Sequence, residues 1–199
     1  MNADKSKNLE EAFLAVGQLI AAAWSYFHVL RALDNGRREN PELVQAFGFF
    51  YERTWRATFD GFFAKVGTVL DSTKGTYSLP NLVTIIKRYG NADTIKCVSE
   101  IQDFLKDRES SVGKLQKWRH DTVAQRPTLR EDEIFYSSNK MNLTEIEAVL
   151  TQIDEIFNRL SMRAVRVHND TRTGTESIVA EGTKFFALAA ASLPAKRSI

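Results

Sequence analysis

Apolar residues recur at alternating spacings of three and four along most of this chain, which places them on one face of an α-helix. The first such face extends from Asn8 to about Leu33 and comprises Leu9, Phe13, Val16, Ile20, Ala23, Phe27 and Leu30. The polar stretch "DNGRRENP" that follows predicts a break, and Pro41 suits the first turn of a second helix. Two long helices are therefore expected in the first part of the chain.

The second apolar pattern drifts around its helix axis between Leu43 and Val69, which is typical of a helix at the centre of a bundle. Ser78 is expected to cap a shorter helix that Gly90 ends, and another helical region begins near Ala92. These signals predict two further helical regions after the two long helices.

Later in the chain, Asn142 and Glu145 have the spacing of a capping box at the start of a helix with a clear apolar face. The polar stretch "HNDTRTGTE" separates this helix from a last one in "SIVAEGTKFFALAAASL". No segment alternates like a strand, and no period of twenty to fifty residues repeats. The chain is thus predicted to be all-α, a helical bundle of about five to six helices.

With 199 residues, of which 43% are hydrophobic, the chain can bury one core, and a single domain over 1–199 is expected. The polar start lacks a secretory signal, and the run "LIAAAW" is far shorter than the ~20 residues of a membrane span. A cytoplasmic protein without membrane contact is the expectation. The apolar stripes either pair two copies of the chain or serve only the interior of one.

Several common chemistries have no sequence support. The single cysteine, Cys97, is interpreted as a buried thiol and excludes internal disulfides. None of the three histidines, His28, His120 and His168, follows a glutamate at the Glu-x-x-His spacing of di-iron bundles. No phosphate-binding glycine-rich loop is present. The sequence therefore predicts no metal site and no cofactor.

The stretch "KLQKWRHDTVAQRPTLR" concentrates positive charge, although the whole chain carries only +2. We call residues 114–130 the basic segment. His120 lies within it, and its cations are Lys114, Lys117, Arg119, Arg126 and Arg130. Such a field attracts the phosphates of a nucleic acid. The alternative is a basic helix end that faces water and is favoured by the helix dipole.

The order of residues within "KWRHDTVAQR" resembles the signature of the HEPN superfamily of small helical bundles, in which a histidine follows an arginine after four to six positions. The similarity is strongest to the abortive-infection group of the AbiU type, whose motif reads like "KWR-polar-basic-x-x-Ala-His-Arg". The resemblance covers roughly 43–162, because the short helix in "NLVTIIK" and the later "LTEIEAVLTQIDEIFNRL" also match that group in order and spacing.

Active members of this superfamily are metal-independent endoribonucleases that join two copies of the motif across a homodimer. The resemblance implies that Arg119 contacts the scissile phosphate and that the histidine moves a proton. In this chain the histidine position is Gln125, which cannot take up a proton at pH 7. His120 adjoins Arg119 but points about 100° away from it on a regular helix, so we expect loss of the proton transfer rather than rescue.

Three hypotheses follow. In the first, a HEPN-like homodimer binds RNA or a partner protein without efficient cleavage, as part of a phage-defence or toxin–antitoxin system with a cognate antitoxin or defence partner. In the second, the protein is an endoribonuclease toxin that uses Arg119 and His120 as catalytic residues. In the third, the basic segment is only a helix end, and the bundle is a non-catalytic scaffold.

Overall fold

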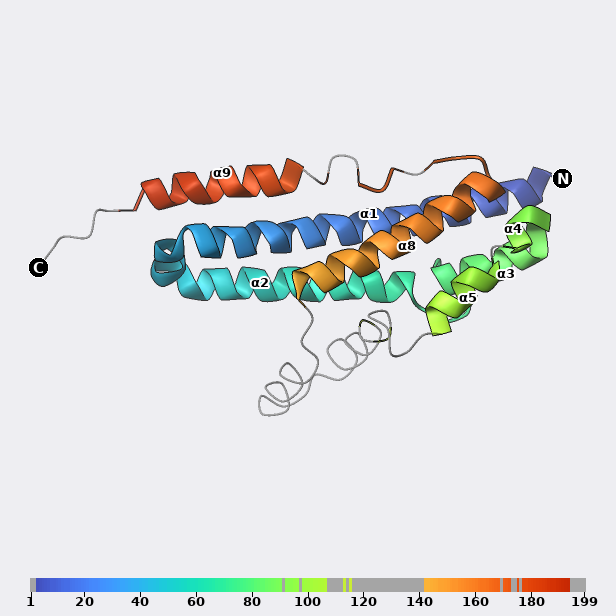
Figure 1. The fold of residues 1–199 in the computed structure, drawn as a ribbon, viewed down its shortest axis with the longest axis horizontal. Coiled ribbons are helices and arrows are strands. Elements are labelled where there is room, and N and C mark those ends of the chain that lie inside the picture. The colour runs from blue at the N-terminus through green and yellow to red at the C-terminus, as the bar shows by residue number, and fades with distance from the viewer. Residues whose placement is uncertain are drawn as a thin grey trace, which may run out of the picture.

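The protein is described here by a computed structural model covering residues 3–90, 92–96, 98–106, 113, 115, 142–168, 170–172, 175 and 177–193. Every regular element in these ranges is a helix (Figure 1). The helices are α1 (Ala3–Glu39), α2 (Pro41–Val69), α3 (Leu79–Tyr89), α4 (Ala92–Lys96), α5 (Val98–Lys106), α8 (Leu143–Ala164) and α9 (Ser177–Ala191). The prediction of an all-α helical bundle is confirmed.

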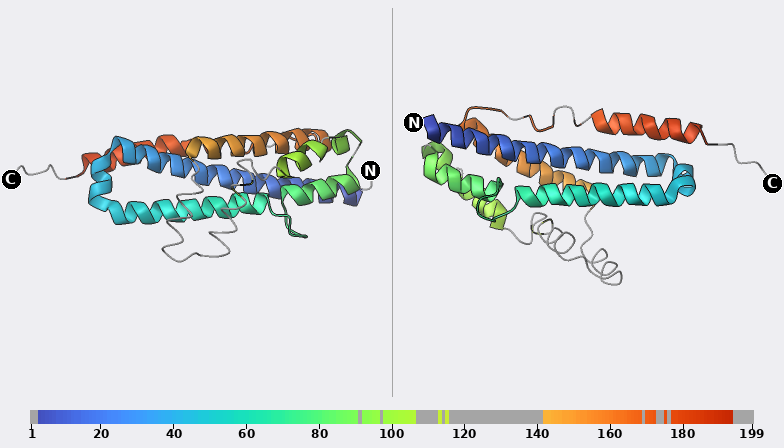
Figure 2. Two further views of the ribbon diagram at one scale, coloured as in Figure 1. Left: turned by 60° about the horizontal axis from the view of Figure 1, so that its bottom comes forward. Right: turned by 180° about the vertical axis from the view of Figure 1, so that it is seen from behind.

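Helix α1 is the centre of the bundle, and α2, α8 and α9 lie along it (Figures 1 and 2). Helix α8 runs antiparallel to α1, from the ring contact of Phe13 with Phe157 at 5.8 Å to the ion pair of Arg31 with Glu147. Helix α9 lies along the second half of α1, where Phe186 contacts Gly36. The prediction that α2 is the central helix is therefore wrong, because α2 packs mainly on one side of α1.

The core is built from the apolar face of α1 together with faces of α2, α3, α5 and α8. Every residue of the predicted α1 face is buried, and Trp24 joins it at 2% exposure. Burying one large apolar side chain contributes roughly 1.5–3 kcal/mol to stability. The burial of this face therefore accounts for why a helix of this length stays straight and central rather than ending early.

The predicted break occurs at Asn40, near the end of the polar stretch, rather than directly after Leu33, since α1 continues to Glu39. Asp34 is paired with Arg37 at 3.1 Å and with Arg38 at 2.7 Å, one turn further along the same helix. Pairs at these spacings stabilise a helix by a few tenths of a kcal/mol each. The charges that were expected to mark a loop thus support the last turns of α1.

Contacts with other helices also hold the end of α1. At Gly36 a Cβ atom would lie 2.5 Å from the ring of Phe186, so the absence of a side chain allows α9 to approach. The Tyr51 hydroxyl of α2 donates a hydrogen bond to the Leu33 carbonyl oxygen. Burial raises the pKa of Tyr51 to about 12, against an opposing effect of Arg37, so the hydroxyl remains protonated and able to donate at neutral pH.

Helix α2 has two different halves. Pro41 occupies its first turn, as predicted, and the backbone kinks at Phe47. Beyond the kink, Phe49 and Phe50 are 73% and 70% exposed, whereas Phe62 and Phe63 near the other end are fully buried. The drift of its apolar face thus reflects a helix that is buried at one end and exposed at the other.

The predicted helix boundaries elsewhere are confirmed. The Ser78 hydroxyl accepts a hydrogen bond from the Asn81 backbone N–H at 3.4 Å, and Gly90 follows the last residue of α3. At the start of α8, the Asn142 side chain accepts from the Glu145 N–H at 2.9 Å, and the Glu145 carboxylate accepts from the Asn142 N–H at 2.9 Å. Both signals act over three residues, so distant contacts do not alter them.

By length and composition alone, the part of α1 from Lys7 to Glu39 is long and apolar enough to cross a membrane. Half of its most apolar window is buried inside the protein, and core helices of soluble proteins commonly pass the same test. Burial in the bundle accounts for the apolar character of α1 without a lipid environment.

Candidate functional site

The residues predicted to carry the chemistry lie outside the described part of the chain. These are Arg119, His120 and Gln125 of the motif, with Lys114, Lys117, Arg126 and Arg130. Cys97, interpreted as a buried thiol, also lies outside it. Leu115, however, is helical and 1% exposed within the core cluster. The chain is therefore anchored in the core four positions before Arg119.

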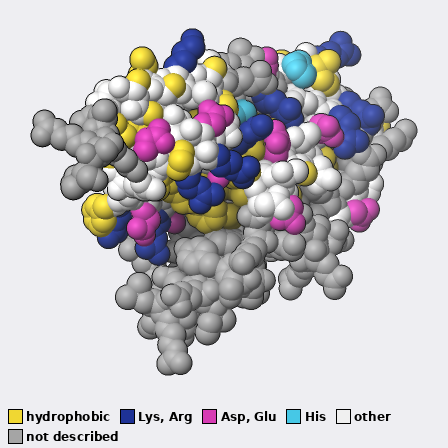
Figure 3. All heavy atoms as spheres, turned by 60° about the vertical axis from the view of Figure 1, so that its left-hand side comes forward, with side chains coloured by type: hydrophobic (Ala, Val, Ile, Leu, Met, Phe, Trp, Pro, Cys, Tyr) yellow, Lys and Arg dark blue, Asp and Glu magenta, His cyan; other side chains and the backbone are white. Residues whose placement is uncertain are grey.

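The described surface offers a contrast to the basic segment. On the face shown in Figure 3, Lys and Arg side chains gather near the middle, and Asp and Glu side chains lie among them. Such mixed charge gives a weaker attraction for phosphates than a run of cations with one opposing carboxylate.

The two described histidines occupy different surroundings. His168 is exposed in the turn after α8. His28 lies within α1, is 7% exposed and lines a cavity at the edge of the core. Its ring stacks on Trp24 with centroids 5.6 Å apart.

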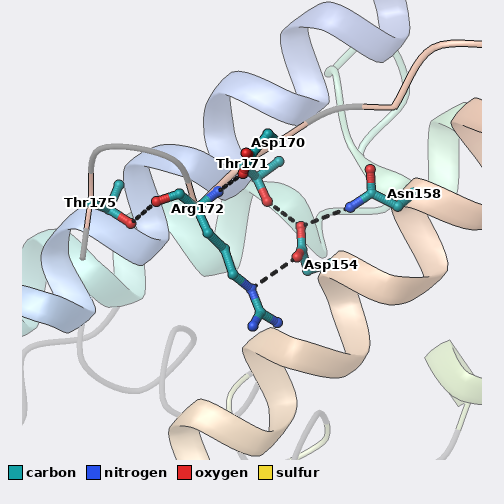
Figure 4. Close-up of polar contacts among 6 residues, drawn as sticks. All are labelled: Asp154, Asn158, Asp170, Thr171, Arg172 and Thr175. Carbon is teal, nitrogen blue, oxygen red and sulfur yellow. Dashed lines mark hydrogen bonds and ion pairs between the residues drawn. The ribbon is translucent and has the colours of Figure 1, made fainter.

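A buried carboxylate organises the contact between α8 and the segment before α9 (Figure 4). Asp154 accepts hydrogen bonds from the Thr171 hydroxyl and from Asn158, the latter at 3.4 Å. Its second oxygen accepts from the Arg172 Nε at 3.1 Å. Since Asp154 is 6% exposed, this network satisfies a carboxylate that would otherwise be costly to bury.

Arg172 is held on two sides. Its Nε is bound to Asp154, and its guanidinium carbon lies 4.4 Å from the centroid of the Trp24 ring in a cation–π contact. In Figure 4 the terminal nitrogens of the guanidinium point away from Asp154. The arginine is thus fixed in orientation while its terminal donors face a different direction from the carboxylate that holds it.

A cavity of about 250 Å³ lies where α1, the start of α8 and the start of α9 meet. We call it the arginine pocket. It is lined by Trp24, His28, Arg31, Glu147, Arg172 and Val179. Arg31 and Glu147 form an ion pair at 2.8 Å at its mouth, with both side chains about 40% exposed. The pocket therefore combines a buried aromatic wall with two arginines.

Sequence reasoning did not find this pocket, although part of the signal was present. Trp24, His28 and Arg31 follow the spacing of four and three that puts them on one helix face, directly beside the apolar stripe. Asp154 lies four residues after Leu150, among the apolar positions of α8. Arg172 was assigned only to a polar break. Its approach to Trp24 depends on tertiary structure and has no local signature.

The model of one protein family, HEPN_AbiU2, described as AbiU2, matches residues 6–179 of this chain. The matched region is wider than the 43–162 suggested by the motif, and it includes α1, the basic segment and the arginine pocket residues. No match was found among curated proteins or among solved structures.

Proposed function

Since this chain belongs to the AbiU2 family of HEPN proteins, we propose that it binds RNA through the basic segment and cleaves RNA inefficiently or not at all. In this proposal the protein acts in a phage-defence or toxin–antitoxin system, where it meets a cognate antitoxin or defence partner. Lys117, Arg119 and Arg126 contact phosphates, and Gln125 forms a hydrogen bond in the same groove.

The observation that carries this proposal is Gln125 at the position of the family histidine. Glutamine donates and accepts hydrogen bonds but does not titrate near neutrality, so it keeps a polar contact and loses proton transfer. Arg119, the arginine of the motif, is retained, and its fork of donors suits a phosphate. Retention of the phosphate contact without the proton carrier favours binding over cleavage.

Charge reversal within the basic segment tests the binding step. Fluorescence anisotropy with a labelled single-stranded RNA should give an affinity that falls with salt concentration for the natural protein. The double variant Lys117→Glu, Arg126→Glu should bind more weakly. It should also show a logarithmic salt slope smaller by about 1.4, since each contact with a single strand contributes about 0.7.

The matched control is Lys74→Glu, Lys87→Glu, which changes the net charge equally at exposed residues outside the basic segment. It should retain most of the affinity of the natural protein. Equal weakening by both double variants would mean that total charge rather than the basic segment governs RNA binding, and the proposal would then be wrong.

One specific feature favours a second candidate function, an endoribonuclease. His120 directly follows Arg119 and is the only titratable group with the right pKa range inside the basic segment. As an acid–base group it would replace the missing histidine, with Arg119 stabilising the charged phosphate. The two candidates differ in whether the natural protein cleaves RNA.

We also propose that two copies of the chain pair through exposed apolar residues of α2 and α9, two helices that contact each other. These residues are Phe49, Phe50, Phe185 and Leu188, each more than 60% exposed. Monomeric soluble proteins rarely expose large apolar side chains in groups, and such groups commonly mark protein interfaces. The dimer expected from family resemblance would use this surface.

Light scattering coupled to size-exclusion chromatography tests the pairing. The natural protein should elute as a dimer at micromolar concentration, and Phe50→Glu should elute as a monomer because it would bury a charge at the interface. Ile95→Glu, a change at an exposed apolar residue of α4, should remain dimeric. A natural protein that is monomeric, or equal effects of both substitutions, would contradict this proposal.

A further inference from the structure

The arginine pocket has the size of a site for a small chemical group. Its volume of about 250 Å³ lies just below the roughly 300–1,000 Å³ of cavities that hold drug-sized ligands. One wall is closed by the buried Trp24 and His28, and the mouth is formed by the half-exposed Arg31 and Glu147. A ligand can enter from solvent and reach buried groups.

The buried indole N–H of Trp24 has no acceptor among the described residues. Trp24 is 2% exposed, and its Nε1 atom is itself buried rather than open to the cavity. The Trp24 side chain therefore closes one wall of the pocket, and the polar contacts with an entering ligand come from the two arginines.

The charged groups of the pocket are arranged to meet an anion. Among the described residues, Glu147 and Asp154 are already engaged, because Glu147 accepts from Arg31 and Asp154 accepts from Arg172. The Arg172 Nε is the only nitrogen of that guanidinium with a partner in the described part of the chain. An entering ligand therefore meets unused N–H donors and few unused acceptors.

These donors come from different sides of the pocket. Arg31 belongs to α1, whereas Arg172 reaches in from the segment before α9. A phosphate group presents acceptor oxygens in several directions, and a guanidinium fork matches two of them. The cation–π contact and the Asp154 bond fix Arg172 in advance, which reduces the entropy lost on binding.

We propose that the arginine pocket binds a phosphate monoester through Arg31 and Arg172. This site is separate from the basic segment, since none of its residues lies within 114–130. Inorganic phosphate, a mononucleotide and the 5′-phosphate end of an RNA all present the required group. The pocket is too small to enclose a whole nucleotide in the usual way, so the phosphate is the part that it recognises.

Isothermal titration calorimetry on the full chain tests the site with inorganic phosphate, adenosine 5′-monophosphate and adenosine as probes. The monophosphate should bind, and adenosine should not. Arg31→Ala, whose partner Glu147 is exposed and tolerates the loss, should weaken binding at least about tenfold. Arg172→Lys keeps a positive charge, removes the fork of donors and should weaken binding by a similar factor.

The control Arg53→Ala removes one cation from α2, outside the pocket lining, and should leave binding unchanged. Arg119→Ala, which impairs RNA binding if the proposed function is correct, should also leave phosphate binding unchanged. Failure of phosphate binding would therefore not be confused with failure of the RNA proposal, because the two depend on different variants.

The source of the phosphate follows from comparing a short RNA that has a 5′-phosphate with the same RNA that has a 5′-hydroxyl. A preference for the phosphorylated end that Arg31→Ala removes would assign the pocket to RNA ends, whereas equal binding of free phosphate and the mononucleotide would assign it to small molecules. The proposal would be overturned if no phosphate probe gave binding heat at millimolar concentration. It would also be overturned if adenosine bound as tightly as the monophosphate, or if Arg53→Ala weakened phosphate binding as much as Arg31→Ala does.

Discussion

Replacing Asp154 by alanine should lower the free energy of unfolding by about 3 kcal/mol. The substitution removes the acceptor of the buried Thr171 hydroxyl and the carboxylate that holds Arg172. Removing one partner of a buried ion pair typically costs about 3–5 kcal/mol. The Arg172 side chain is 36% exposed and can turn toward water, so the lower end of that range is expected.

Urea unfolding followed by circular dichroism measures this loss, and Glu147→Ala is its matched control. Glu147 lies on the same helix and pairs with Arg31, but both side chains of that pair are about 40% exposed. An exposed pair contributes about 0–1 kcal/mol. Equal losses for Asp154→Ala and Glu147→Ala would show that burial does not set the strength of the Asp154 network.

The helix boundaries predicted correctly from sequence depend on hydrogen bonds between residues that are close together in the chain. The capping box of Asn142 and Glu145 and the cap at Ser78 each act within one helical turn. The end of α1 was predicted too early, because contacts with residues far along the chain hold its last turns. Gly36 reads as a breaker in sequence, yet it admits Phe186 of α9, which lies 150 positions further along the chain.

The candidate sites divide in the same way. The motif around Arg119 was found because its residues are contiguous, and the family match supports that resemblance. The arginine pocket was missed because Arg172 reaches Trp24 only after α8 has returned along α1. Helical spacing places Trp24, His28 and Arg31 on one face, but it cannot supply the fourth side chain that makes the face a pocket.

The largest expected effect on function comes from Gln125→His. In the proposed function, this substitution restores a group that titrates near neutral pH at the position that the resemblance assigns to the histidine, six positions after Arg119. General acid–base catalysis typically contributes about a hundred- to ten-thousandfold to the rate. If the remaining frame of the ribonuclease is intact, RNA cleavage by Gln125→His should exceed that of the natural protein by a factor in this range.

A double variant isolates the role of Arg119. Arg119→Ala combined with Gln125→His should lose the restored cleavage, since the proton carrier alone cannot stabilise the charge on the phosphate. A combined variant that still cleaves RNA at the restored rate would indicate a contaminating nuclease or a different catalytic site. The comparison therefore also checks that any restored activity belongs to this motif.

The most direct test of the central claim is incubation of an end-labelled structured RNA with the purified natural protein in the presence of a chelator, beside Arg119→Ala and Gln125→His. RNA binding without cleavage by the natural protein, and cleavage by Gln125→His, is the predicted result. Cleavage by the natural protein that disappears in Arg119→Ala would contradict it and would identify an endoribonuclease in which His120 carries the proton.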